Sequence, residues 1–123
     1  MEGKKKTRGQ LITVEERHFV DHQGSPTRKF KVTPPITTLK RGEKVAIVYD
    51  GPKSGVVMIP VPGVFNKQVH LVPRGKQPQI ELKVLPKAPL GEFSFAVICN
   101  DGRSDHYGEG ASPPKIVIKD PKP

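Results

Sequence analysis

The sequence predicts an all-β fold, an antiparallel Greek-key β-sandwich, and three observations support this class. Short segments in which apolar and polar residues alternate recur along the chain, and a period of two residues is the pattern of a half-buried strand. Turn residues separate these segments at intervals of about 8 to 12 residues, which is typical of sandwiches and barrels. The 14 prolines are spread over the 123 residues, and interior proline breaks helices.

The first half of the chain contains four expected strands, and turn residues cluster between them. They are residues 10–20, 28–34, 36–40 and 43–50. The apolar residues expected to share one face lie two apart within a strand. They are Phe30 and Val32 in one strand, and Val45, Ile47 and Tyr49 in another.

The second half contains five more expected segments. They are residues 56–62, 64–72, 79–86, 93–99 and 114–120. Proline punctuates the first of these, which indicates an edge strand or one that leaves the sheet. The residues expected to share one face are Ile80, Leu82 and Val84, then Phe93, Phe95, Val97 and Cys99, and finally Ile116 and Ile118.

The chain divides into one domain and two short tails. We expect residues 1–9 to be a disordered basic tail, because they are charged and lack apolar periodicity. Residues 10–120 form the single sandwich domain, and residues 121–123 are a C-terminal tail. No apolar run is long enough to span a bilayer, so we expect no membrane span.

The net charge of +9 favours contact with anionic partners. Lys4, Lys5, Lys6 and Arg8 form the densest basic cluster and are the candidate anion-binding residues, for a polymer or a surface. The alternative is an ordinary solvated surface with lysines on edge strands. Only 6% of the residues are aromatic and there is no Trp, so platforms for stacking on nucleic-acid bases are scarce.

Two stretches resemble the cupredoxins, the blue-copper proteins. "KVTPPITTLKRGEKVAIVYDG" is similar to the segment in which an extended stretch leads through a turn to a core strand. "GEFSFAVICNDGRSDHYGEGASPPKIVIKD" is similar to the C-terminal hairpin of that family, in which a Cys ends the penultimate strand. The resemblance implies a cupredoxin-like sandwich. An immunoglobulin-like sandwich is the alternative.

The resemblance also implies a copper site of two His, one Cys and usually a Met, a ligand set that suits copper in both redox states. Cys99 matches the thiolate, and His106 is the candidate for the His that follows it. No Met lies in the loop after His106. Lys53, Ser54 and Gly55 occupy the region where the first His is expected. The copper ligand set is therefore incomplete.

Other residues offer alternatives for the metal site. His70 and Met58 are substitute ligands, although Met58 lies in an apolar run that indicates core packing. His18 and His22 are four apart, but their context indicates strand and turn. Without a metal, Cys99 is a small buried hydrophobe, and His106 is a hydrogen-bonded loop residue.

We therefore expect a non-catalytic binding or accessory domain without a complete copper site and without a cofactor, which binds a protein partner. The alternatives are a copper-binding or electron-transfer domain using Cys99 and His106, and a basic module for an anionic polymer. A nucleophilic Cys99 would need a base such as His106, but no element that builds an oxyanion hole is evident. The compartment is cytoplasmic as written, or extracytoplasmic if a leader was removed, because cupredoxins are mostly exported.

Overall fold

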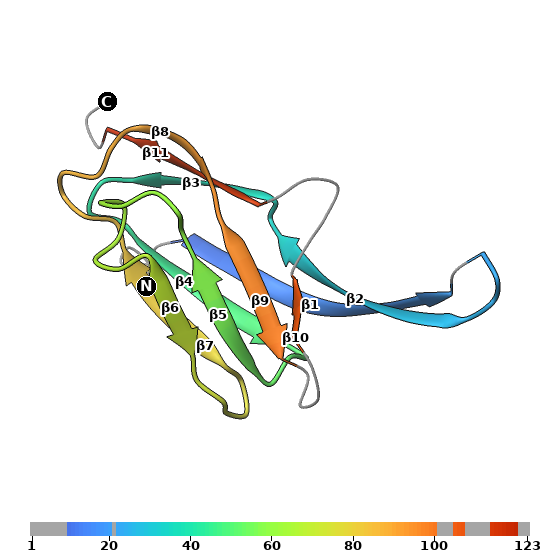
Figure 1. Cartoon of the computed structure of the whole chain (residues 1–123). Coiled ribbons are helices and arrows are strands. Elements are labelled where there is room, and N and C mark those ends of the chain that lie inside the picture. The colour runs from blue at the N-terminus through green and yellow to red at the C-terminus, as the bar shows by residue number, and fades with distance from the viewer. Residues whose placement is uncertain (1–9, 21, 101–104, 108–113, 121–123) are drawn as a thin grey trace, which may run out of the picture.

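The structure, a computed structural model, describes residues 10–20, 22–100, 105–107 and 114–120. Its strands form two layers (Figure 1). The first layer is a four-stranded sheet with the order β2-β1-β4-β7. These strands are β1 (Gln10–Val20), β2 (Pro26–Thr33), β4 (Lys44–Asp50) and β7 (Gln79–Lys83).

The second layer contains two sheets that share a nearly continuous strand. Their orders are β3-β11-β8 and β10-β9-β5-β6. The strands of the first are β3 (Ile36–Lys40), β8 (Gly91–Ser94) and β11 (Lys115–Lys119), and those of the second are β5 (Ser54–Met58), β6 (Val69–Val72), β9 (Ala96–Asn100) and β10 (Asp105–Tyr107). Only Phe95 separates β8 from β9, and its N–H donates to the carbonyl oxygen of Pro114 at 3.0 Å.

Most strand pairs are antiparallel, as the alternating pattern predicts, but two pairs are parallel. β1 runs parallel to β4, and β3 runs parallel to β11. Parallel neighbours need a long connection. Between β1 and β4, for example, the chain forms β2 in the same sheet and then β3 in the other layer. Strands that are distant in sequence therefore lie side by side.

The core lies between the layers and is built from the faces that the alternation predicts. The buried residues include Phe30 and Val32 of β2 and the inward-facing residues of β4, β9 and β11. Within the described residues no helix is long and apolar enough to cross a lipid bilayer.

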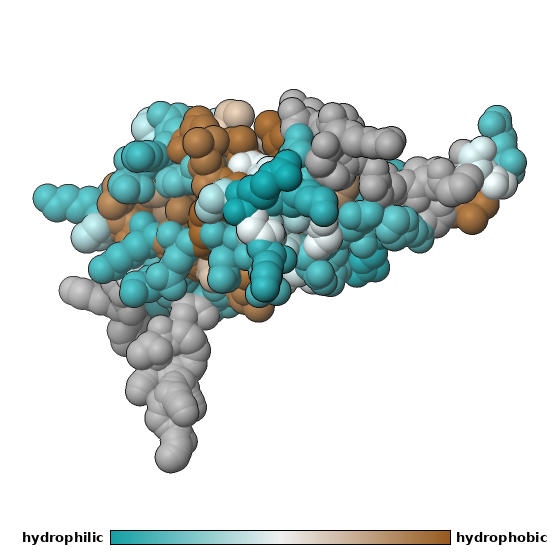
Figure 2. Space-filling view, turned by 90° about the horizontal axis from the view of Figure 1, so that it is seen from below, coloured by the Kyte–Doolittle hydropathy of each residue, from teal (hydrophilic) through white to brown (hydrophobic). Residues whose placement is uncertain are grey.

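The hairpin of β1 and β2 projects from the sandwich as an arm (Figure 1). β1 pairs with β4 only from Gln10 to Glu15, whereas its pairing with β2 continues to Val20. The apolar side chains visible in Figure 2 gather mainly on the sandwich body.

The structure differs from the expected elements most clearly in the second half of the chain. β5 begins and ends earlier than the segment 56–62, and only the end of 64–72 forms a strand, β6. The expected strand 93–99 is divided at Phe95, and β10 lies within what the sequence suggests is a loop. The predicted tails, residues 1–9 and 121–123, lie outside the described residues, and so does the cluster of Lys4, Lys5, Lys6 and Arg8.

Candidate functional site

Cys99 lies on the inward face of β9 and is fully buried. Its register partner on β5 is Gly55. On the other side of β9, the backbone of His106 in β10 is the register partner of Cys99. The side chain of His106 lies outside the described part of the structure. The fold therefore brings the backbones of the two predicted metal residues together.

Tyr49 reaches this point from the opposite layer. It is buried at the end of β4, and its hydroxyl donates to the carbonyl oxygen of Ile98 at 3.1 Å. A second carbonyl oxygen, that of Val56, lies 3.5 Å from the same hydroxyl. A buried tyrosine hydroxyl normally needs such a partner, and here the partners are the two strands β9 and β5. The Tyr49 side chain thus ties the two layers together beside Cys99.

Gly55 makes room for the Tyr49 ring. A Cβ at position 55 would lie 2.6 Å from Cε2 of Tyr49 and 2.8 Å from its hydroxyl oxygen. It would also lie 2.0 Å from the carbonyl oxygen of Ile98. A glycine inside a strand often marks a close approach of this kind. No side chain larger than hydrogen fits at position 55.

Burial controls the protonation of both groups. Removal of the thiolate from water raises the pKa of Cys99 from 9.0 to about 12. Burial also raises the pKa of Tyr49 above its ordinary value, and the nearby Cys99 adds to this effect. At neutral pH the structure therefore holds a protonated thiol beside a neutral phenol.

The segment that the resemblance aligns with the first histidine ligand does lie beside Cys99. The N–H of Lys53 donates to the carbonyl oxygen of Asn100 at 2.8 Å, and Ser54 and Gly55 pair with Asn100 and Cys99. The Lys53 side chain is exposed. The backbone arrangement matches the expectation, but the residues at these positions supply no imidazole.

The substitute ligands do not reach Cys99. His70 is on β6, and β5 lies between β6 and β9, so about 10 Å of sheet separates the two strands. Its Nε2 lies 2.8 Å from the carbonyl oxygen of Lys67, and its ring packs edge-on against Phe65.

The other candidate ligands, Met58, His18 and His22, are all exposed. The interpretation of Met58 as a core residue is wrong, because Met58 faces outward and is exposed. Successive residues of a strand point to opposite faces. Val57 points into the core, so its neighbour Met58 points outward. His18 is exposed on the arm, 3.0 Å from a carboxylate oxygen of Glu16, and His22 is exposed after β1.

These residues do not fit a type 1 copper centre. The described side chains include no group of three or more His, Cys, Asp or Glu residues placed to hold a metal. The inward position opposite Cys99 belongs to Gly55, and the ring of Tyr49 packs over it. A type 1 copper centre needs two imidazoles beside its thiolate, and Lys53, Ser54 and Gly55 supply none.

Comparison with known proteins bears on the fold. No protein-family model and no curated protein matches the sequence. Among solved structures, an oxidised proline-to-glycine mutant of amicyanin matches with a TM-score of 0.50 and 12% identity, over 95% of this chain and 88% of the other. The chain has a cupredoxin-like fold.

Two further solved structures of similar kind match this cupredoxin-like chain. The apo form of a copper-binding protein has a TM-score of 0.44 and 22% identity, over 94% of this chain and 93% of that one. A reduced Cu(I) form of another amicyanin mutant has a TM-score of 0.45 and 16% identity, over 89% and 82% of the two chains. The first of the three structures confirms the all-β sandwich predicted from the sequence, in a cupredoxin-like form.

Sequence reasoning placed Tyr49 on the core face but missed its role beside Cys99. Two signals were available. Gly55 interrupts an apolar strand, which indicates a close backbone approach. A tyrosine in the inward set of a core strand also has to find an acceptor for its hydroxyl.

Proposed function

We propose that this chain is a non-catalytic binding or accessory domain that uses a cupredoxin-like fold without a type 1 copper centre. The observation that carries the proposal is the packing of Tyr49 over Gly55 and beside Cys99. This packing fills the inward position next to the thiol with an aromatic ring. Cys99 then contributes to stability as a buried apolar residue.

One observation favours the alternative, a copper-binding or electron-transfer domain. The backbone of His106 lies opposite Cys99 in register. Imidazole and thiolate are both ligands that copper prefers. Binding at this pair would require the thiol to lose its proton and the Tyr49 ring to move.

A copper titration separates the two functions. Cu(II) is added in stoichiometric amounts to the protein at neutral pH, and the visible spectrum is recorded together with a count of free thiols. We expect no intense thiolate-to-copper charge-transfer band and one unmodified thiol per chain. Cys99→Ala and His106→Ala are the controls. An intense band that disappears in both variants would overturn the metal-free proposal and establish the alternative.

A further inference from the structure

β6 is an edge strand without the usual protection of edge strands. Edge strands are normally kept from pairing with other chains by charged residues, proline or bulges. Within the described sheets, the other strands that end a sheet are β2, β7, β3, β8 and β10, and each contains at least one Lys, Arg, Asp or Glu. The four residues of β6, Val69 to Val72, include none.

The backbone of β6 offers hydrogen-bonding groups to this open edge. The N–H of Ile59 donates to the carbonyl oxygen of Gln68 at 2.8 Å, which flanks the register pair of Met58 and Val69. Hydrogen-bonded and non-hydrogen-bonded pairs alternate in antiparallel ladders. Val69 and Leu71 therefore direct their N–H and C=O groups away from β5, towards the open edge.

Apolar side chains continue to this edge on the outer face of the sheet. Leu71 is 74% exposed and Val69 is 50% exposed. Their register partners on β5, Val56 and Met58, belong to the same outward-facing set. Isolated exposed apolar residues are common, but a contiguous group at an open edge is typical of an interaction site.

A groove runs along this edge, between β6 and β7. Its volume is about 570 Å³. Val69, His70 and Leu71 of β6 line it on one side, and Ile80, Glu81 and Leu82 of β7 line it on the other, with Lys67 just before β6. A strand added to β6 would place alternate side chains over the apolar outer face and into this groove.

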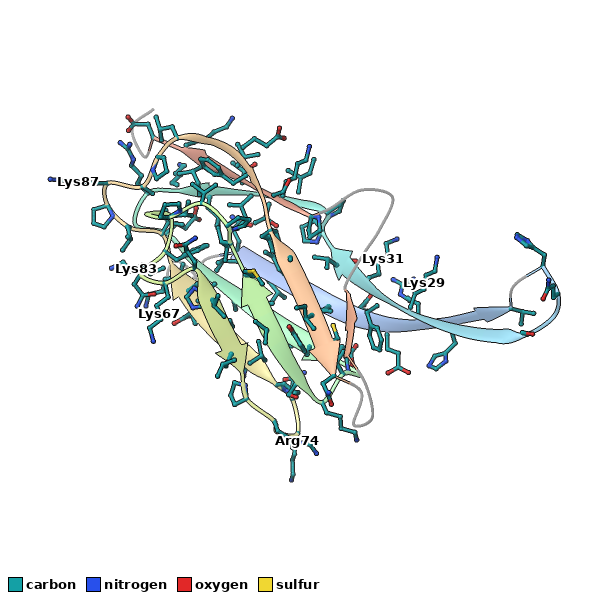
Figure 3. The ribbon with its side chains drawn as sticks, viewed as in Figure 1. Lys29, Lys31, Lys67, Arg74, Lys83 and Lys87 are labelled. Atoms are coloured by element: carbon teal, nitrogen blue, oxygen red, sulfur yellow. The ribbon has the colours of Figure 1, made fainter. Side chains whose placement is uncertain are left out.

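The charges at the two ends of the groove are mainly positive. Lys67 and Lys83 lie near the end where β6 begins and β7 finishes, and Arg74 lies in the connection between these strands (Figure 3). Glu81 is a negative residue of the lining. An occupant with acidic side chains would be complementary to this distribution, and a second copy of a chain with net charge +9 would be repelled.

We propose that β6 binds an extended, acidic segment of a protein partner, which pairs with the edge as an additional strand. This inference rests on the proposed binding role and names its surface. Main-chain hydrogen bonds to Val69 and Leu71 supply the pairing, and the alternate pockets supply selectivity for apolar residues. The lysines and Arg74 select for negative charge.

The test uses a capped eight-residue peptide in which Glu and Val alternate, titrated into isotope-labelled protein with EDTA present. We expect NMR shifts confined to β6, β7 and their connection, and slower hydrogen exchange of the Val69 and Leu71 amides. A peptide of the same length in which Lys and Val alternate is the matched control, and it should not bind. Binding should weaken as salt is added.

Two substitutions of Leu71 distinguish the contribution of its backbone N–H to peptide binding from that of its side chain. Leu71→Pro removes an N–H that points away from β5, so the native pairs remain. Binding should weaken about two- to tenfold for the lost hydrogen bond. Leu71→Thr keeps this N–H and a strand-forming side chain, so it should bind the peptide more tightly than Leu71→Pro. If the proline variant does not fold, the wild-type protein is titrated with peptides N-methylated at every Val or at every Glu. One of these two peptides should lose binding.

Several results would overturn the proposal. They are absence of binding, shifts outside β6 and β7, equal binding of the Lys-containing peptide, and an unchanged affinity of Leu71→Pro. Sedimentation showing a dimer that Leu71→Pro dissociates would assign the edge to a second copy instead. Complete competition by heparin, with no effect of Leu71→Pro, would assign the binding to general polyanion affinity. A copper charge-transfer band would contradict only the metal-free function, because the peptide titration is performed in EDTA.

Discussion

Replacement of Gly55 by alanine tests the packing around Cys99 directly. The added Cβ would meet a ring carbon and the hydroxyl oxygen of Tyr49 and the carbonyl oxygen of Ile98, all closer than 3.0 Å. The ring could turn aside, but the carbonyl oxygen belongs to the backbone of β9. At 2.0 Å from the new Cβ, it can be relieved only if β5 and β9 separate by about 1 Å.

The expected cost follows from these contacts. Overpacking a close-packed interior costs about 1 to 3 kcal/mol. If the Tyr49 ring is displaced, its hydrogen bond to Ile98 is also lost, which adds about 1 kcal/mol. We therefore expect Gly55→Ala to lower the free energy of unfolding by about 2 to 4 kcal/mol. That is a large part of the stability of a domain of this size.

Chemical denaturation of both proteins measures this difference, and Gly75→Ala is the matched control. Gly75 lies in the connection between β6 and β7, and a Cβ there would meet nothing within 4 Å. Its substitution should change the free energy of unfolding by less than about 0.5 kcal/mol. Equal stability of Gly55→Ala and Gly75→Ala would refute the close packing of Tyr49 on β5.

Two further predictions concern the same cluster. The pKa of the Cys99 thiol is raised from 9.0 to about 12 in the folded protein, so its stabilising contribution is complete below pH 9 and is lost as the pH rises towards 12. Three pKa units correspond to about 4 kcal/mol. Between pH 8 and 11 the free energy of unfolding, measured by chemical denaturation, should fall more steeply with pH in wild type than in Cys99→Ala. Equal pH dependence of the two proteins would contradict the burial effect. Tyr49→Phe should cost about 1 kcal/mol in the same assay at pH 7, whereas a more stable variant would show that the hydroxyl's bond to Ile98 contributes nothing.

The strands that could be predicted are those with strict alternation. Val45, Ile47 and Tyr49 are buried because every second residue of a half-exposed strand faces the core. Alternation fails where apolar residues pack without a ladder. Val64 and Phe65 are buried in the connection between β5 and β6, where the carbonyl oxygen of Val64 accepts the N–H of Leu85. The sequence pattern cannot distinguish such residues from a strand.

The candidate site was predicted only in part, because its chemistry depends on contacts between layers. The position of Cys99 follows from the alternation of its own strand, and β10 then brings the His106 backbone opposite it. The contact of Tyr49 with Gly55 joins β4 of one layer to β5 of the other. The alternation of apolar and polar residues within one strand carries no information about a contact between two layers. The parallel pairs β1–β4 and β3–β11 escaped prediction for the same reason.

The position of β11 has a consequence for how this protein reaches its native state. β11 is the last of the described strands to be synthesised, yet it lies between β3 and β8 as a central strand. While the ribosome is still making residues 115–119, β3 has no neighbour in its own sheet. Pairing between segments so distant in sequence is slow to form. The β3-β11-β8 sheet therefore forms only after β11 has been synthesised, and until then Thr37 and Leu39, which are buried in the folded protein, lack their neighbouring strand.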